Sequence, residues 1–83
     1  MLSNDEVESC LIELLPKFSG RLPDRDLENA RDLIEHREWG VGLELLCTQL
    51  DENDVVLSAD VISVLGAIAG KLNVDISYLK ASL

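Results

Sequence analysis

The hydrophobic residues of this chain recur every three or four positions, which is the period of an amphipathic α-helix. Four segments follow this pattern, and they begin near residues 3, 23, 39 and 59. Asp75 suits the start of one more short turn close to the end of the chain. We therefore expect an all-α fold, a compact bundle of about four helices with a short C-terminal helical turn, in a single domain over residues 1–83.

The first two helices are marked by residues that suit helix ends. Ser3 and Glu6 have the Ser-x-x-Glu spacing of a capping box at the start of the first helix. Pro16 lacks the amide that a continuous helix uses, so this helix either kinks there or gives way to a looser turn. Gly20 is a natural stop, and Pro23 suits the first turn of the second helix. The two helices are therefore expected on either side of Gly20.

The third helix is expected to begin at the junction Trp39-Gly40 and to end near Leu50. Trp39 is the only tryptophan, and a large aromatic residue at a helix junction is more often a packing residue than a ligand-binding one. We therefore expect it to anchor the core at this corner. Val41 and Leu45 fall on the other side of the helix, where another element covers them or they are exposed to a partner.

The fourth helix is expected to run from about residue 59 to residue 72, with Ser58 as its cap. Nearly all of its sides are apolar or small, which is typical of the central helix of a bundle. Gly66, Ala67 and Gly70 would let a neighbouring backbone approach closely, either within the fold or across a dimer. We favour the contact within the fold.

Charge is distributed unevenly along the chain. Sixteen acidic and seven basic residues give a net charge of −9. Residues 1–54 hold fourteen of the acids and five of the bases, whereas residues 55–83 hold two of each. The first part is therefore expected to build an acidic surface and the rest to supply core. Such a charge disfavours nucleic acid and anionic lipid and favours a basic partner, although acidity also simply keeps a protein soluble.

Two groups of acidic residues are candidates for binding such a partner. The polar side of the second helix carries four acids about one turn apart, the acidic stripe: Asp24, Glu28, Asp32 and Glu35. The densest negative charge follows the third helix and forms the acidic turn: Asp51, Glu52 and Asp54. A charged stripe opposite an apolar one is also what any surface helix shows, so the stripe has a purely structural interpretation as well.

The chain offers few groups for catalysis or metal binding. His36 is the only histidine, and Cys10 and Cys47 fall on apolar helix faces, so we expect neither a zinc site nor a disulfide. An EF-hand loop starting at Asp51 fails at its glycine and at its final carboxylate position. Ser58 lacks the Asp-Ser-Leu pattern of an acyl carrier protein. We expect no enzyme activity, no metal and no cofactor.

The location is expected to be the cytoplasm. The first residues are acidic, whereas a signal peptide begins with basic ones. The longest uncharged run near the end, residues 61–70, is ten residues long, about half of the roughly 20 that cross a bilayer. No membrane partner is therefore expected.

Residues 18–50 contain a set of short motifs that together resemble a known family. The motifs are Asp24-x-Asp26-Leu27, Ile34-Glu35-His36, and Glu38-Trp39-Gly40 followed by Leu43-Glu44 and Leu46. A weaker likeness continues through Leu57-Ser58 to the Leu-Asn-Val-Asp of residues 72–75. In these motifs the chain resembles the MafI family of bacterial immunity proteins, which neutralise polymorphic secreted toxins. It departs from the family at Gly42, where alanine is expected, and in the turn after Leu50, which lacks an aromatic residue.

The resemblance implies a cytoplasmic antidote that binds the C-terminal domain of a cognate toxin and blocks its active site or its access to substrate. Toxins of this kind are often nucleases, whose active sites are electropositive, and an acidic surface competes well for such a site. Contact residues do not carry over between family members, so the stripe and the turn are chosen on local charge alone. The alternative is a non-catalytic interaction or regulatory module, either as a single chain or as a homodimer through Val41, Leu45 or the small face of the fourth helix. We favour a monomer.

Overall fold

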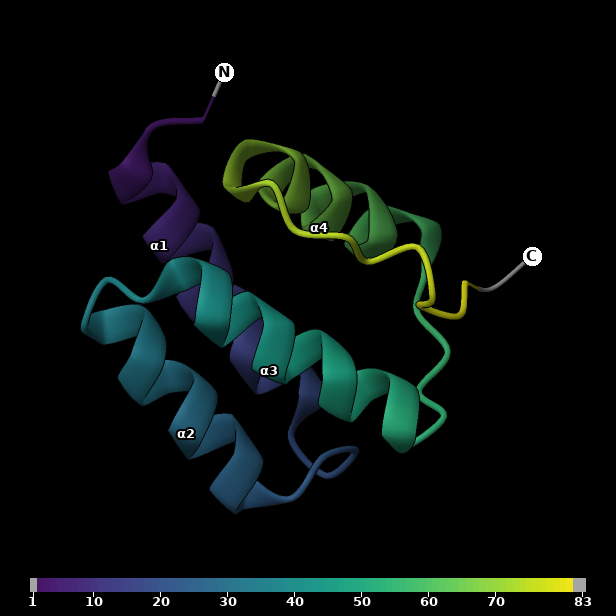
Figure 1. The fold of residues 1–83 in the computed structure, drawn as a ribbon. Helices are drawn as coiled ribbons and strands as arrows, with labels where there is room; N and C mark the ends of the chain where they lie inside the picture. Colours follow the sequence, from purple (N-terminus) through teal and green to yellow (C-terminus); the bar gives the residue numbers. More distant parts are fainter. Residues whose placement is uncertain (1, 82–83) are drawn as a thin grey trace.

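The helical periodicity of the sequence becomes four α-helices and one 3-10 helix in the computed structural model, which describes residues 2–81 (Figure 1). In chain order these elements are α1 (Asn4–Leu14), η1 (Leu15–Phe18), α2 (Asp24–Glu35), α3 (Trp39–Glu52) and α4 (Ala59–Leu72). Pairing of the β type within residues 2–81 is limited to two isolated bridges, between Ser19 and Leu22 and between Leu57 and Ala81. The predicted all-α fold is therefore confirmed.

The starts of α1 and α4 follow the caps that the sequence indicates. The Ser3 hydroxyl accepts a hydrogen bond from the Glu6 amide at 3.2 Å, and the Glu6 carboxylate accepts one from the Ser3 amide at 3.0 Å. The bond from the Ser3 amide to the carboxylate, followed by the interaction of the carboxylate with the Ser3 hydroxyl, lowers the pKa of Glu6. The Ser58 hydroxyl accepts from the amide of Val61 at 3.3 Å. Pro16 lies in η1, so the chain takes the looser turn rather than a kinked helix.

Three helices end at residues with left-handed backbone geometry, and none of the three is glycine. The φ angles are 63° at Arg37, 53° at Asp54 and 59° at Asn73, after α2, α3 and α4 respectively. Asn73 suits this place, because asparagine tolerates left-handed geometry better than most residues. Gly20, with φ 83°, turns the chain after η1.

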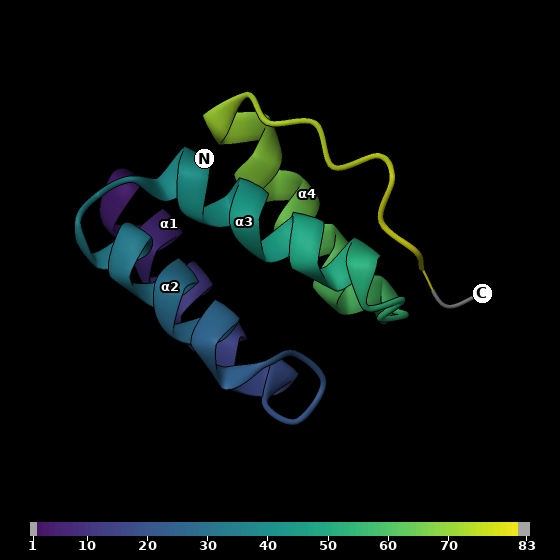
Figure 2. The same cartoon turned by 60° about the horizontal axis from the view of Figure 1, so that its bottom comes forward.

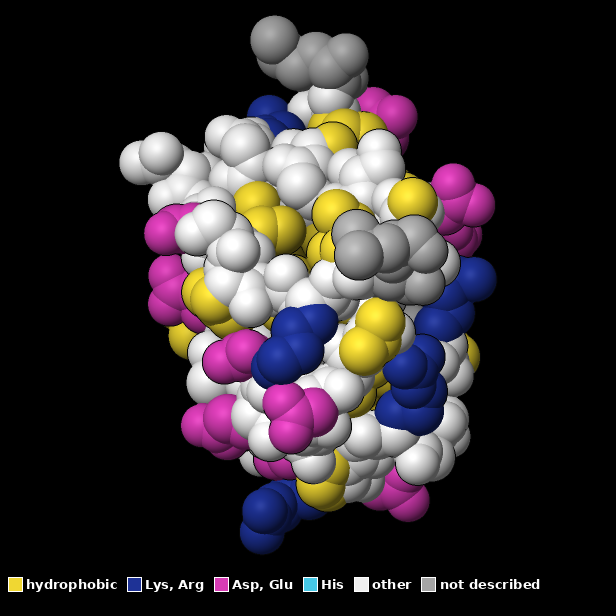
Figure 3. Space-filling model, turned by 90° about the vertical axis from the view of Figure 1, so that its right-hand side faces the viewer, with side chains coloured by type: hydrophobic (Ala, Val, Ile, Leu, Met, Phe, Trp, Pro, Cys, Tyr) yellow, Lys and Arg dark blue, Asp and Glu magenta, His cyan; other side chains and the backbone are white. Residues whose placement is uncertain are grey.

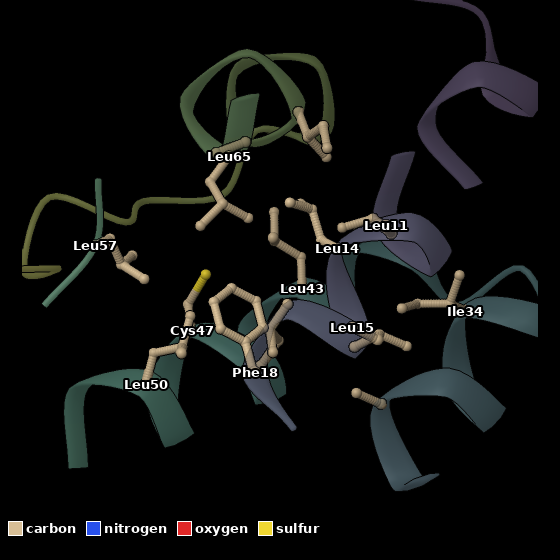
Figure 4. Close-up of a cluster of buried hydrophobic side chains, with 14 of the residues drawn as sticks. Leu11, Leu14, Leu15, Phe18, Ile34, Leu43, Cys47, Leu50, Leu57 and Leu65 are labelled. Atoms are coloured by element: carbon tan, nitrogen blue, oxygen red, sulfur yellow. The ribbon is translucent and has the colours of Figure 1, made fainter. Parts of the chain in front are cut away.

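The core forms where all four α-helices and η1 converge, and Figure 4 shows Phe18 from η1 among their side chains. Within residues 2–81 no polar or charged side chain is buried, so the core is held by hydrophobic packing. Its largest fully buried side chains are Phe18, Leu11, Leu15, Ile34, Leu43, Leu46, Leu50, Leu57, Leu65 and Ile68.

The single tryptophan lies at the margin of this core. Trp39 is half-buried and packs against the core, and its Nε1–H donates to Oε1 of Glu8 at 3.0 Å. The indole therefore joins the start of α3 to α1, as expected of a corner residue, while Phe18 is the aromatic side chain inside. On the other side of α3, Val41 is 51% exposed and Leu45 is half-buried.

The prediction that α4 is the central helix is wrong, because α3 occupies that place. α3 packs against α1, α2 and α4, whereas α3 is the main helical neighbour of α4. Figures 1 and 2 show α2 and α4 on opposite sides of α3. The buried residues of α4 are Leu65, Ile68 and Ala69. Its small residues are apolar, but their side chains do not have the volume to fill a core.

No helix within residues 2–81 has the length and hydrophobicity to span a bilayer.

The close backbone approach expected at the small residues of α4 forms at Gly42 of α3 instead. A Cβ atom at Gly42 would lie 2.9 Å from Cγ1 of Ile34 and 3.5 Å from the carbonyl oxygen of Ala30, both in α2. A Cβ atom at Gly66 or Gly70 would meet nothing within 4 Å. The expected internal contact of α4 is therefore wrong, and the α2–α3 pair, the most extensive in the fold, uses a glycine for its packing.

The chain after α4 forms the C-terminal strap, residues 74–81, which runs back beside α4 towards the end of α3 (Figure 2). Asp75 accepts a hydrogen bond from the amide of Ser77 at 2.9 Å, which lowers the pKa of Asp75. One turn follows, closed by the amide of Leu79 donating to the carbonyl of Ile76 at 3.1 Å. The expected terminal turn is thus present, and the rest of the strap is extended.

Candidate partner-binding surfaces

The acidic stripe lies on the outward side of α2. Ala30 and Ile34 of this helix are fully buried, whereas the four stripe residues are exposed. Residues spaced by three or four positions are neighbours on a helix surface, so the carboxylates follow one another along one side. Within residues 2–81, no basic side chain lies within ion-pair distance of Asp24, Glu28 or Glu35. These three carboxylates are therefore open to an external cation.

The stripe is held in place by the way in which α2 begins and ends. The carbonyl of Pro23 accepts the amides of Asp26 at 3.0 Å and Leu27 at 3.2 Å, which starts the helix just before Asp24. Acidic residues in a first turn are stabilised by the positive end of the helix dipole. At the other end, the amide of Arg37 donates to the carbonyl of Ile34 at 3.0 Å.

Asp32 is the stripe residue that has a partner. Nδ1 of His36 lies 2.7 Å from the backbone oxygen of Asp32 and 3.4 Å from its Oδ1. The hydrogen bond to this backbone oxygen, followed by the charge of the Asp32 carboxylate, raises the pKa of His36 above 6.5. The end of the stripe nearest the C-terminus of α2 is therefore most negative above the pKa of His36. Below that pKa, the protonated His36 adds a positive charge there.

The acidic turn belongs mostly to α3, which continues to Glu52 and so passes the expected end near Leu50. Asp51 and Glu52 lie in the last turn of the helix, and Asp54 takes the left-handed geometry that ends it. The amide of Val55 donates to the carbonyl of Leu50 at 3.0 Å, and the Val55 side chain is buried. This buried anchor fixes where the acidic turn projects.

Two of the three carboxylates in the acidic turn already have a cation. Nζ of Lys80, in the C-terminal strap, lies 2.9 Å from Oδ1 of Asp54 and 3.3 Å from Oδ1 of Asp51. The amide of Leu57 donates to the carbonyl of Lys80 at 2.9 Å, which holds the lysine in reach. The ion pair lowers the pKa of Asp54 and raises that of Lys80. We call this arrangement the Lys80 clasp, and it leaves Glu52 as the turn carboxylate outside the ion pairs of the described residues.

The structure does not bring the stripe and the turn together. Figures 1 and 2 show α2 running alongside α3 in the opposite direction, so most of α2 lies away from the end of α3 and only its amino-terminal end comes near it. Figure 3, which faces the end of α3 and the strap, shows Lys and Arg side chains standing beside acidic ones, with hydrophobic side chains between them. At this end Arg21 also donates to the carbonyl of Val56 at 3.0 Å. The turn is therefore part of a surface of mixed charge.

Groups with chemical reactivity lie apart from one another. Cys47 is buried, and burial raises the pKa of its thiol to about 12, while Cys10 is half-buried and also free. Ser58 is engaged as the cap of α4. Across the part of the chain that the structure describes, no three side chains of His, Cys, Asp or Glu gather as metal ligands do.

Comparisons of the chain with protein-family models, curated proteins and solved structures find no match. The resemblance to the MafI family therefore stays a prediction based on the quoted motifs. The structure explains one of the departures from that family, because Gly42 sits where α2 and α3 touch and a side chain there would meet Ile34.

Proposed function

We propose that this chain is an immunity protein that binds a cognate secreted toxin in the bacterial cytoplasm and occludes its active site or substrate surface. The toxin is expected to be basic and to be a nuclease. The chain contributes binding and no chemistry. The observation that carries the proposal is the acidic stripe, because three of its carboxylates are exposed and outside any ion pair within residues 2–81.

The physical reason is complementarity of charge. A nuclease must present positive charge to hold phosphate groups, and a row of carboxylates on a rigid helix offers that surface an alternative ligand. The stripe is accessible without any rearrangement of α2, because Ala30 and Ile34 on the inward side of this helix are buried in the core. The acidic turn is a secondary candidate, since a partner must compete with Lys80 for Asp51 and Asp54.

A growth test addresses the function itself. The gene for this chain is expressed in cells together with the C-terminal domain of the toxin encoded beside it, under separate control. Expected is rescue of growth and a stable complex of the two purified proteins. If the toxin domain kills equally well with and without this chain, and the two proteins do not bind, the proposal is refuted.

A pair of charge-reversal variants tests which surface makes the contact. The variant Glu28→Lys/Glu35→Lys changes the stripe and leaves Asp32, the partner of His36, in place. The control variant Glu13→Lys/Glu44→Lys changes the net charge equally on exposed positions of α1 and α3. Complementary charge raises association rates by about 10- to 1,000-fold. The stripe variant should therefore associate with the toxin domain about tenfold more slowly than the control variant at low salt. Equal rates for both variants would exclude the stripe.

The contribution of the acidic turn is tested by Glu52→Lys. Glu52 is the turn carboxylate that does not pair with Lys80, so its reversal leaves the clasp in place. A slower association in this variant would add the turn to the contact surface. An unchanged association rate would confine the contact to the stripe.

A further inference from the structure

The outward side of α4 has an uncharged strip between one acidic and one basic residue. Asp60 and Lys71 are eleven residues apart, which is about three helical turns, so both fall on the same side of the helix. Both side chains are exposed, and neither lies in an ion pair within residues 2–81. Between them lie Val64 and Ala67, and the exposed positions beside this strip are Ser63, Gly66 and Gly70.

No other element within residues 2–81 covers this side of α4. A Cβ atom at Gly66 or Gly70 would meet nothing within 4 Å, and the Val64 side chain is 39% exposed. Beside it, Ala67 and Lys71 line an open hollow of about 500 Å³ together with Leu2 and Glu6 of the amino-terminal region. An apolar helix side with room for another backbone is thus presented outward.

We infer that this side of α4 binds the same side of α4 in a second copy of the chain, with the two helices antiparallel. The charges of Asp60 and Lys71 determine the relative direction of the two helices. In an antiparallel pair, Asp60 of each copy faces Lys71 of the other, which makes two ion pairs by symmetry. A parallel pair would instead place Asp60 against Asp60 and Lys71 against Lys71. Opposite charges of the two copies therefore face each other only in the antiparallel arrangement.

The positions of the small residues agree with the register that these ion pairs set. Pairing Asp60 with Lys71 puts the symmetry axis at the height of residues 65 and 66, and on the side of the two charges the positions nearest to that axis are Val64 and Ala67. Val64 of one copy then packs against Ala67 of the other. Small residues at such a crossing let two backbones come close enough for continuous van der Waals contact.

The charge of the rest of the molecule explains why the contact is made here. Each copy carries a net charge of −9, so most of its surface repels a second copy. Residues 55–83 contain two acids and two bases and are neutral, and the acidic stripe lies on the opposite side of α3. A second copy that meets α4 therefore avoids most of the repulsion, and the stripe stays accessible.

The size of the surface sets the expected strength. α4 has 14 residues and is about 21 Å long, so one helix pair buries less than the roughly 1,200 to 2,000 Å² of stable specific interfaces. We therefore expect a weak dimer. Sedimentation equilibrium of the full chain from about 10 µM to about 1 mM should show a reversible rise from monomer to dimer mass.

Charge exchange tests the antiparallel geometry. Asp60→Lys and Lys71→Asp, each alone, should weaken self-association about tenfold, because two ion pairs become two like-charge contacts. An equimolar mixture of the two variants should associate as the wild type does, since every contact is again between opposite charges. Single variants that dimerise as well as the wild type, or a wild type that is monomeric at about 1 mM, would overturn the inference.

A steric variant tests the close approach independently of charge. Ala67→Gln should abolish the dimer, whereas Ser9→Gln, the same residue introduced on an exposed position of α1, should leave it intact. Circular dichroism at low micromolar concentration reports whether each variant is folded. Loss of the dimer in both variants, or in neither, contradicts a contact through α4.

Discussion

Replacing Gly42 by alanine tests how closely α2 and α3 approach. The new Cβ atom would lie 2.9 Å from Cγ1 of Ile34, a distance at which either the Ile34 side chain or one of the two helices must shift. Ile34 is fully buried, so its side chain has little room to move aside. Overpacking of this kind costs about 1 to 3 kcal/mol, while alanine in place of glycine in a helix returns about 1 kcal/mol. The net expectation is a loss of about 0 to 2 kcal/mol of stability.

Gly66→Ala is the matched control, because Gly66 is also inside a helix but has nothing within 4 Å of the new Cβ atom. Only the helix propensity changes there, so this variant should gain about 0.5 to 1 kcal/mol. The two glycine-to-alanine changes are chemically identical and should differ by roughly 1 to 3 kcal/mol in the free energy of unfolding.

Urea and thermal unfolding at low micromolar concentration measure this difference without interference from self-association. For a domain of this size, 1 kcal/mol corresponds to a shift of about 4 to 8 °C in Tm. Gly42→Ala should therefore melt below Gly66→Ala by several degrees. If alanine at position 42 stabilises the protein as much as alanine at position 66, the α2–α3 approach described above is incorrect.

Three further predictions concern titrating groups. Cys47 should resist thiol reagents in the folded protein while Cys10 reacts, because burial raises the Cys47 pKa to about 12; two equally reactive thiols would contradict this. NMR titration should place the pKa of His36 above 6.5, and Asp32→Asn should lower it only in part, since the bond to the backbone oxygen remains. The stabilisation from His36 is then complete below pH 6.5 and disappears as the pH rises through the pKa in the folded state. In Lys80→Met, the pKa of Asp54 should rise towards its ordinary value; an unchanged pKa would mean that the clasp does not form in solution.

The helices and their starts were predictable because their signals are local. The capping box of Ser3 and Glu6 and the cap at Ser58 each involve residues three positions apart, and both form as expected. The ends were less predictable. Arg37 and Asp54 adopt left-handed geometry that favours glycine, and the hydrogen bonds of the surrounding turn hold them there. The sequence has no marker for such an ending.

The place of α4 in the bundle was not predictable from its own composition. Hydrophobicity on all sides is typical of a buried helix. It does not distinguish a helix that is packed against other helices on every side from one whose small side chains leave part of its surface exposed. The order of the chain decides the outcome. α2 and α3 form a tightly packed pair, α1 lies against both, and α4 is left with α3 as its main neighbour.

Of the two candidate binding surfaces, the acidic stripe depends on residues close together in the sequence, whereas the acidic turn depends on a residue far from it. The exposure of the acidic stripe follows from the helical period, which puts the apolar Ala30 and Ile34 on the other side of α2, where the structure buries them. The Lys80 clasp joins residues 29 positions apart, and nothing in the pattern around Lys80 indicates a carboxylate partner. A dense run of acids in a sequence is therefore weaker grounds for a binding surface than a spaced row on one helix side, because a distant base can neutralise the run.

The proposed toxin contact on α2 and the proposed self-contact on α4 lie on opposite sides of α3, so an experiment can exclude one and leave the other. Glu28→Lys/Glu35→Lys changes the surface of α2 and should not weaken self-association; it should strengthen it slightly, because it reduces the net negative charge of each copy. Ala67→Gln changes α4 without altering charge and should leave the association rate with the toxin domain unchanged. If Ala67→Gln instead prevents toxin binding while the protein stays folded, then the toxin itself occupies α4, and the acidic stripe is an ordinary solvated surface.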